Sequence, residues 1–148
     1  MLSFISRKFV QQQNKNLQAQ RRKLTNLVLS VPKESLEGEY RVALTPVHVS
    51  KLKKAGATIQ IEKGAGLGSG FTDELYVKAG ATLVDSASAW KSPLICKVRP
   101  PTLEEAKKIE NRSIMSVIQP RVNTELMNAL LAQKATVYSM VCILKYTY

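Results

Sequence analysis

The chain has 148 residues, is 45% hydrophobic and carries a formal net charge of +11. This length allows one domain with a real hydrophobic core. The positive excess lies mainly at one end: residues 1–33 hold seven basic and no acidic side chains, whereas residues 34–148 hold 15 basic and 11 acidic ones. The body has no dense cationic patch with interleaved aromatic residues, which argues against nucleic-acid binding. No apolar run reaches the ~18 residues that a membrane helix needs.

Residues 1–24 have the features of a mitochondrial transit peptide. They contain no acidic residue, and Leu2, Ile5 and Phe9 recur at helical spacing beside two basic side chains. An amphipathic, basic, acid-free N-terminus is typical of mitochondrial import. A disordered basic tail without an import role is the alternative. We expect this segment to lie outside the folded domain.

The body, residues 25–140, is predicted to alternate strands and helices. Apolar or alternating runs predict strands at residues 25–31, 57–62, 81–84, 94–98, 113–118 and 135–143. Segments with start and stop signals predict helices at residues 46–55, 72–79, 85–90, 102–110 and 123–132. Such alternation favours an α/β domain with a parallel sheet covered on both faces, a three-layer arrangement of the Rossmann-like or flavodoxin-like type.

Three predicted strands end in a proline next to a cation or an amide. The three tips are Val31-Pro32-Lys33-Glu34, Lys97-Val98-Arg99-Pro100 and Gln119-Pro120-Arg121. Ligands of parallel sheets bind beyond the carboxyl ends of the strands. Arg41 stands between the first tip and a helix start at Thr45-Pro46, a placement that suits an anionic ligand.

The glycines at positions 64, 66, 68 and 70 do not match the G-x-G-x-x-G pattern of a dinucleotide site. Their loop lies between a predicted strand and a predicted helix, and Asp85 follows at a suitable distance, but Asp85 begins a helix instead of ending the next strand. A flexible surface or interface turn is the default expectation, and a dinucleotide site is the alternative.

The remaining candidates for chemistry have simpler interpretations. Cys96 and Cys142 each lie in an apolar run without a CxxC motif, which favours two reduced packing cysteines and gives no support for a zinc site. His48 follows a helix start and is expected to be a surface or capping residue. We expect no metal site.

The body resembles the N-terminal domain of alanine dehydrogenases and pyridine nucleotide transhydrogenases. The matching motifs are Val31-Pro32-Lys33-Glu34, Arg41-Val42-Ala43-Leu44-Thr45-Pro46, Gly64-Ala65-Gly66, Ala79-Gly80-Ala81 and Lys97-Val98-Arg99-Pro100-Pro101. A second group is more similar to the transhydrogenase branch: Ser116-Val117-Ile118-Gln119-Pro120, Asn123, Glu125-Leu126 and Thr136-Val137. The resemblance covers residues 27–140.

The resemblance is to the opening part of the NAD(H)-binding domain I, or alpha subunit, of proton-translocating NAD(P) transhydrogenase. It implies hydride transfer between NAD(H) and NADP(H), coupled to proton movement across a membrane. In mitochondria this setting is the inner membrane, with domain I facing the matrix. The implied partners are the remaining transhydrogenase domains or subunits, and domain I forms a homodimer in the family.

The alanine dehydrogenase branch implies a role for two residues. There, the positions of Arg41 and Lys97 bind the carboxylate and the carbonyl of pyruvate, and the catalytic histidine falls at Gln119. Because an amide cannot shuttle a proton near neutral pH, Gln119 argues against alanine dehydrogenase chemistry. The alternative for Arg41 and Lys97 is an ion pair with Glu34 or a neighbouring acid that holds the loops.

Residues 141–148 diverge from the family pattern and resemble a truncated end. Lys145 stands near the start of the loop that contacts nicotinamide in the family, and the second, glycine-fingerprint domain does not follow. We therefore expect this chain alone to bind neither NAD(H) nor NADP(H) tightly and to be inactive. Two alternative hypotheses are the N-terminal domain of a saccharopine or lysine-ketoglutarate reductase and a non-enzymatic α/β interaction module.

Overall fold

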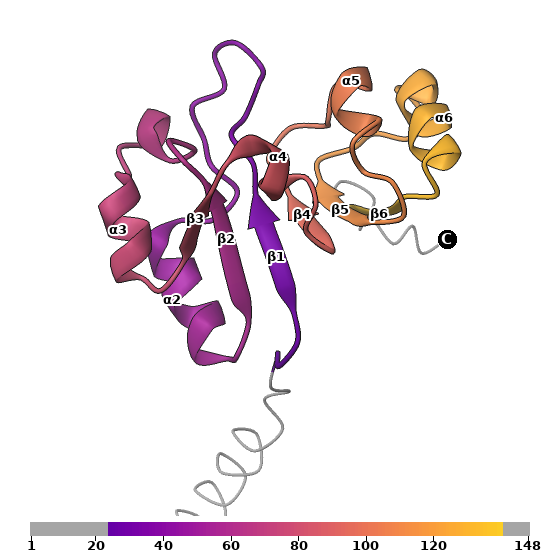
Figure 1. Cartoon of the computed structure of the whole chain (residues 1–148). Coiled ribbons are helices and arrows are strands. Elements are labelled where there is room, and N and C mark those ends of the chain that lie inside the picture. Colours follow the sequence, from indigo (N-terminus) through magenta and orange to yellow (C-terminus); the bar gives the residue numbers. More distant parts are fainter. Residues whose placement is uncertain (1–23, 141–148) are drawn as a thin grey trace, which may run out of the picture.

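Residues 24–140 form one six-stranded sheet with helices packed on it (Figure 1). The computed structural model describes these residues. The predicted transit peptide up to residue 23, the divergent end, Cys142 and Lys145 lie outside the described residues. The strands are β1 (Val28–Val31), β2 (Thr58–Glu62), β3 (Thr82–Val84), β4 (Leu94–Cys96), β5 (Ser113–Ser116) and β6 (Thr136–Ser139). The helices are α2 (Pro46–Lys54), the 3-10 turn η1 (Leu67–Ser69), α3 (Asp73–Lys78), α4 (Ser86–Ala89), α5 (Leu103–Ala106) and α6 (Thr124–Ala132).

The strand order is β3-β2-β1-β4-β5-β6, and every pair is parallel. This confirms the predicted parallel α/β sheet, and the order is that of the Rossmann fold, not that of flavodoxin. The chain builds outward from β1 to β3, returns, and builds outward from β4 on the other side. The order therefore reverses between β1 and β4, the place where ligands of such sheets bind.

The sheet has one hydrophobic core on each face, and the core around β1 and β2 extends to Leu94 and Cys96 of β4. Alternate residues of β1 and β2, among them Val31 and Ile61, pack with α2 and α3, from which Val49 and Tyr76 are fully buried. Ile95 of β4 and Ile114 of β5 point to the opposite face and pack with residues of α5 and α6. Helix α4 covers the second face of β1, where the Ser30 hydroxyl donates to the Ala89 carbonyl at 2.6 Å.

Local signals set most element boundaries. Helix α2 begins at Pro46, whose missing N–H costs nothing in the first turn, and its C-terminal end is followed by Gly56 with a φ of 100°. The Asp85 carboxylate accepts the Ser88 N–H at 2.7 Å and caps α4, as its predicted place at a helix start requires.

The helix predicted over residues 102–110 is wrong beyond residue 106. Thr102 and Glu105 form a reciprocal capping box that starts α5. The α-helix then ends at Ala106, because the next turn tightens: the Lys108 N–H donates to the Glu105 carbonyl and the Ile109 N–H to the Ala106 carbonyl. The strand predicted over residues 94–98 likewise ends at Cys96.

One face of the β5–β6 edge has no covering helix within residues 24–140. Met115 and Tyr138 are paired in register and share this face, and Met140 follows Tyr138 at the same alternation. Tyr138 is 52% exposed and Met140 47% exposed. In the same described part of the chain, no helix has the length and apolar character that crossing a membrane requires.

Candidate functional site

The tips of β1 and β4 meet at the point where the strand order reverses, and Glu34 joins them. Its carboxylate accepts the Val98 N–H at 2.7 Å and the Arg99 N–H at 3.4 Å. The same carboxylate lies 3.6 Å from the Lys97 ammonium. Pro32 ends β1, and Glu34 follows two residues later. The hydrogen bonds of its carboxylate extend the contact between β1 and β4 beyond the last residue pair of the two strands.

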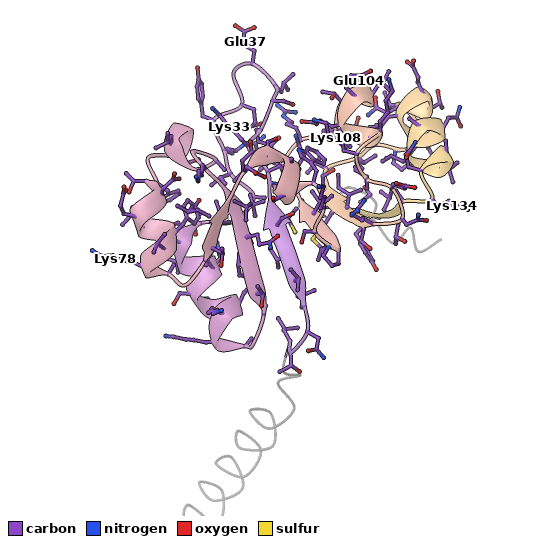
Figure 2. All side chains as sticks on the ribbon, in the orientation of Figure 1. Lys33, Glu37, Lys78, Glu104, Lys108 and Lys134 are labelled. Carbon is purple, nitrogen blue, oxygen red and sulfur yellow. The ribbon has the colours of Figure 1, made fainter. Side chains whose placement is uncertain are left out.

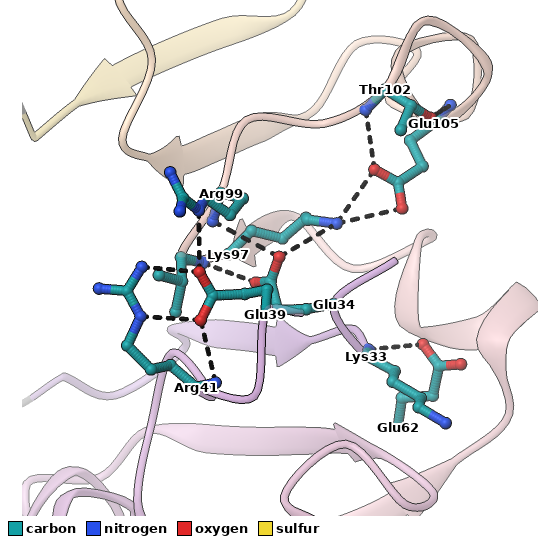
Figure 3. A network of polar contacts seen from close by, with 10 residues as sticks. Lys33, Glu34, Glu39, Arg41, Glu62, Lys97, Arg99, Thr102 and Glu105 are labelled. Atoms are coloured by element: carbon teal, nitrogen blue, oxygen red, sulfur yellow. Dashed lines mark hydrogen bonds and ion pairs between the residues drawn. The ribbon is translucent and has the colours of Figure 1, made fainter. Parts of the chain in front are cut away.

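Lys97 is a buried cation held by two carboxylates. Its side chain is 1% exposed, and both oxygens of Glu105 lie at 3.0 and 3.1 Å from Nζ (Figure 3). The ammonium also stands 5.5 Å from the centroid of the Trp90 ring, within the range of a cation–π contact. A buried charge is stable only when it is paired and hydrogen-bonded, and here Glu34 and Glu105 supply that pairing. In this structure Lys97 forms the ion pair with Glu34 that was considered as the alternative to ligand binding, and a second one with Glu105.

Arg41 lies in the loop after β1 and is bound by Glu39. The guanidinium donates from Nε and Nη2 to the two carboxylate oxygens at 2.8 and 2.6 Å, the forked geometry of a strong pair. Arg99 donates to the same carboxylate at 2.8 Å. The hydrogen bond from Arg41 is the main cause that lowers the pKa of Glu39 to about 2, against the opposing effect of burial.

Two hollows open at this edge, and the Glu34–Leu36 segment separates them. The larger, of about 530 Å³, is lined by Arg99, the start of α5 and the start of α6. The smaller, of about 280 Å³, is lined by Arg41, Glu39 and the glycine loop. Lys97 lines neither hollow. Arg41 and Lys97, to which the alanine dehydrogenase resemblance assigns pyruvate binding, thus belong to one polar network, but only Arg41 faces an open space.

The glycine loop is packed against its own chain. A Cβ on Gly66 would lie 2.5 Å from the Tyr76 ring and 2.8 Å from the Phe71 carbonyl oxygen, so the position has room for glycine alone. The Tyr76 hydroxyl donates to the Leu44 carbonyl at 2.9 Å, and burial raises the pKa of Tyr76 to about 12. Gly66 therefore allows the loop to pack closely against the Tyr76 ring of α3.

His48 and Cys96 have the local positions that their simple interpretations predicted. His48 Nδ1 is 2.9 Å from the Thr45 hydroxyl at the start of α2, and its side chain is exposed. Cys96 is a buried free thiol, and burial raises its pKa to about 11. Gln119 is exposed beyond β5. Within the part of the chain that the structure describes, no cluster of three metal-ligating side chains occurs.

Sequence reasoning missed three members of the polar network: Glu39, Trp90 and Glu105. Two of them carry local signals. Thr102-x-x-Glu105 is the spacing of a capping box, and Glu39 stands two residues before Arg41 in a turn, close enough for a side chain to fold back. Trp90 carries no such signal, because its contact with Lys97 depends on how α4 crosses the sheet.

The chain belongs to the family described as alanine dehydrogenase/PNT, N-terminal domain, whose model matches residues 30–147. It is 40% identical over 115 residues to the NAD(P) transhydrogenase subunit alpha of Haemophilus influenzae, covering 77% of this chain and 22% of that protein. It is also 40% identical over 89 residues to alanine dehydrogenase 1 of Staphylococcus aureus, covering 60% of this chain and 24% of that protein.

Two solved structures share the fold. The transhydrogenase of Sinorhizobium meliloti superimposes with a TM-score of 0.75 at 33% identity, covering 81% of this chain and 36% of that one. An L-alanine dehydrogenase superimposes with a TM-score of 0.74 at 33% identity, covering 76% and 32%. The chain therefore spans about a quarter of the curated relatives and about a third of the solved chains. The predicted homology to the N-terminal domain of the transhydrogenase alpha subunit is confirmed.

Proposed function

We propose that this chain supplies the N-terminal part of the NAD(H)-binding component of a proton-translocating NAD(P) transhydrogenase, which passes hydride between NAD(H) and NADP(H). The observation that carries this proposal is the enclosure of Lys97 between Glu34 and Glu105. An ammonium that is 1% exposed and already paired twice is not available to polarise the carbonyl of a keto acid. Gln119, where the alanine dehydrogenase branch has its catalytic histidine, adds a second argument against that chemistry.

In this role the strand-tip network is a scaffold. Glu34 fixes the tip of β1 to the tip of β4, and Glu39 fixes the following loop through Arg41 and Arg99. A nicotinamide cofactor bound by a second domain needs a rigid surface opposite it, since small displacements of the reacting groups are costly. The proposed contribution of this chain is that surface, without a proton-transferring group of its own.

The proposed partners are the remaining transhydrogenase domains or subunits, with a homodimer as in the family. Support comes from the apolar side chains that are exposed on two surfaces: Tyr138 and Met140 on the sheet, and Leu36, Tyr40 and Val122 at the strand tips. Tyr40 is 70% exposed and Val122 73% exposed, and such side chains are commonly buried by a neighbour in a larger assembly.

Two chimeric proteins test whether this chain serves a transhydrogenase or an alanine dehydrogenase. Residues 24–140 would replace the equivalent segment of the Haemophilus influenzae alpha subunit and, separately, of the Staphylococcus aureus alanine dehydrogenase. We expect hydride transfer between the two nicotinamide cofactors to survive in the first chimera. Alanine deamination should be lost in the second and return in part when Gln119→His is added. The reverse pattern, with a dead transhydrogenase and an active alanine dehydrogenase, would contradict the proposal.

The chain by itself is proposed to be inert. Calorimetric titration of the 148-residue protein with NADH should give no saturable heat in the micromolar range, and micromolar binding would refute this expectation. One observation favours a second function, the binding of a carboxylate ligand at Arg41. The Arg41 side chain is 65% exposed and lines the smaller hollow. Titration with pyruvate tests it in the same instrument.

The proposed location is the matrix side of the mitochondrial inner membrane. It rests on the acid-free, amphipathic composition of residues 1–24, in keeping with a membrane-coupled enzyme. Fusion of residues 1–30 to a fluorescent protein should direct the fluorescence to mitochondria. A diffuse cytosolic signal would exclude import by this segment.

A further inference from the structure

A second charged region lies away from the strand tips, in a groove between α4 and the segment that joins α5 to β5. The groove has a volume of about 540 Å³, within the range of small-molecule sites. Four cations line it, Lys91, Lys107, Lys108 and Arg112, and one carboxylate, that of Glu110. Lys91 lies shortly before β4 and Arg112 directly before β5, so the groove extends to the amino ends of the strands, opposite the edge described above.

Arg112 is held in place by the backbone on both sides of the groove. Its Nε donates to the Lys91 carbonyl at 3.1 Å, and its Nη1 donates to the Glu110 carbonyl at 2.8 Å. A guanidinium has five N–H donors, so three have no partner among residues 24–140. Carbonyl acceptors fix the orientation of the guanidinium without neutralising its charge. Arg112 is thus a preorganised donor with its charge uncompensated.

The neighbouring lysines add charge that nearby acids offset only in part. Lys108 Nζ stands 5.8 Å from the Trp90 ring centroid and has no carboxylate partner within the described chain. Lys107 is paired with Glu104 at 2.6 Å in an exposed contact, which is weak in water. Lys91 acts electrostatically on Asp85, whose carboxylate is already engaged with the start of α4.

The shape and charge of the groove limit what it could bind. Trp90 is 4% exposed, so its ring offers no platform on which a base could stack. Two or more negative charges are needed to engage cations that come from both walls at once. We propose that this groove binds a small multivalent oxyanion, a diphosphate or a polycarboxylate, through Lys91 of the α4 wall and Lys108 and Arg112 of the facing wall. This site is independent of the proposed transhydrogenase role, because it shares no lining residue with the two hollows at the strand tips.

Calorimetric titration of the full 148-residue chain with inorganic pyrophosphate tests the proposal, with citrate as the polycarboxylate arm and monovalent chloride as the competitor. We expect one pyrophosphate or citrate per chain, bound less tightly as NaCl rises. Lys108→Gln and Arg112→Gln should each weaken binding about tenfold, the loss of one charge-assisted contact. Whichever anion binds more tightly identifies the chemistry of the ligand.

The matched control is Lys78→Gln, at the exposed C-terminal end of α3, which lies well away from Lys108 in Figure 2. It removes the same charge and should leave the affinity unchanged. Glu110→Gln removes the one lining carboxylate and should strengthen binding severalfold, an effect that unfolding cannot imitate. If Arg112→Gln fails to fold, the double variant Lys107→Gln/Lys108→Gln replaces it.

Three results would overturn the proposal. The first is no saturable binding of either anion at low salt. The second is an equal loss of affinity in Lys78→Gln and Lys108→Gln, which would mean binding to net charge alone. The third is an unchanged or weakened affinity in Glu110→Gln. The single tryptophan offers a second readout, since recruitment of Lys108 to the anion would alter the emission of Trp90.

Discussion

Replacing Lys97 by methionine should remove a large share of the stability of this domain. Methionine fills a similar volume, so the main effect is to leave Glu34 and Glu105 buried without their cation. Their side chains are 4% and 11% exposed, too little for water to take over the role of Lys97. Removing one partner from a buried ion cluster costs about 3–5 kcal/mol. Total stabilities of domains are about 5–15 kcal/mol, so this change would remove from about a fifth to nearly all of the free energy of unfolding.

Urea unfolding followed by circular dichroism measures this effect. With a denaturant slope of about 2 kcal/mol per molar, the midpoint should fall by roughly 1.5–2.5 M. The matched control is Lys107→Met, which breaks the pair with Glu104, where the side chains are 65% and 78% exposed. That change should cost at most about 1 kcal/mol.

A second substitution separates lost charge balance from lost packing. Glu105→Gln keeps the capping box, because glutamine serves at that position too, and it removes one orphaned carboxylate. The double variant Lys97→Met/Glu105→Gln should therefore be more stable than the sum of the two single changes predicts. If Lys97→Met costs no more than Lys107→Met, the buried cluster does not hold the strand tips.

Three further predictions follow from individual contacts. Gly66→Ala should destabilise the domain by about 1–3 kcal/mol, because the added Cβ would overlap the Tyr76 ring. The midpoint of thermal unfolding measures this loss, and an unchanged midpoint would show that there is no clash. The lowered pKa of Glu39, about 2, means that its stabilising contribution is complete above about pH 4.5 and is lost as pH falls through 2. Glu39→Gln should accordingly reduce the stability difference between pH 5 and pH 2 in urea titrations; an unaltered difference would exclude the pair. The Cys96 thiol is buried and its pKa is raised to about 11. In a Cys142→Ser background it should therefore stay unreactive toward a thiol reagent at pH 8 until urea unfolds the chain. Rapid labelling of the native protein would contradict its burial.

The parallel sheet and its edge of strand tips were predictable because their causes are local. Alternating apolar runs, Pro46 at a helix start and Asp85 as a cap all act within a few residues of where they stand. The same reasoning failed over residues 107–110, where composition still favours a helix but the chain tightens and then turns at Asn111, with a φ of 53°.

The candidate site was only half predictable, because its main interaction is not local. Lysine is rarely buried, so nothing in the sequence around Lys97 signals a side chain that is 1% exposed. Its burial depends on Glu34, which is distant in sequence and arrives only when β1 and β4 pair. The ion-pair hypothesis named Glu34, which does pair with Lys97, but it did not name Glu105, the second partner of Lys97. Arg41 pairs with Glu39, which the hypothesis did not name either.

The contact between β1 and β4 is the shortest strand pairing of the sheet, and we expect it to separate two units of local unfolding. Only two residue pairs join these strands, Leu29 with Leu94 and Ser30 with Ile95, whereas four pairs join β1 to β2 and four join β5 to β6. The two hydrophobic clusters lie on opposite faces of the sheet, and only the first crosses this contact, through Leu94 and Cys96 of β4. Native-state hydrogen exchange should therefore resolve two blocks of amides with separate opening free energies. Glu34, which binds the amides of Val98 and Arg99 across the boundary, would then set how strongly the opening of one block depends on the other.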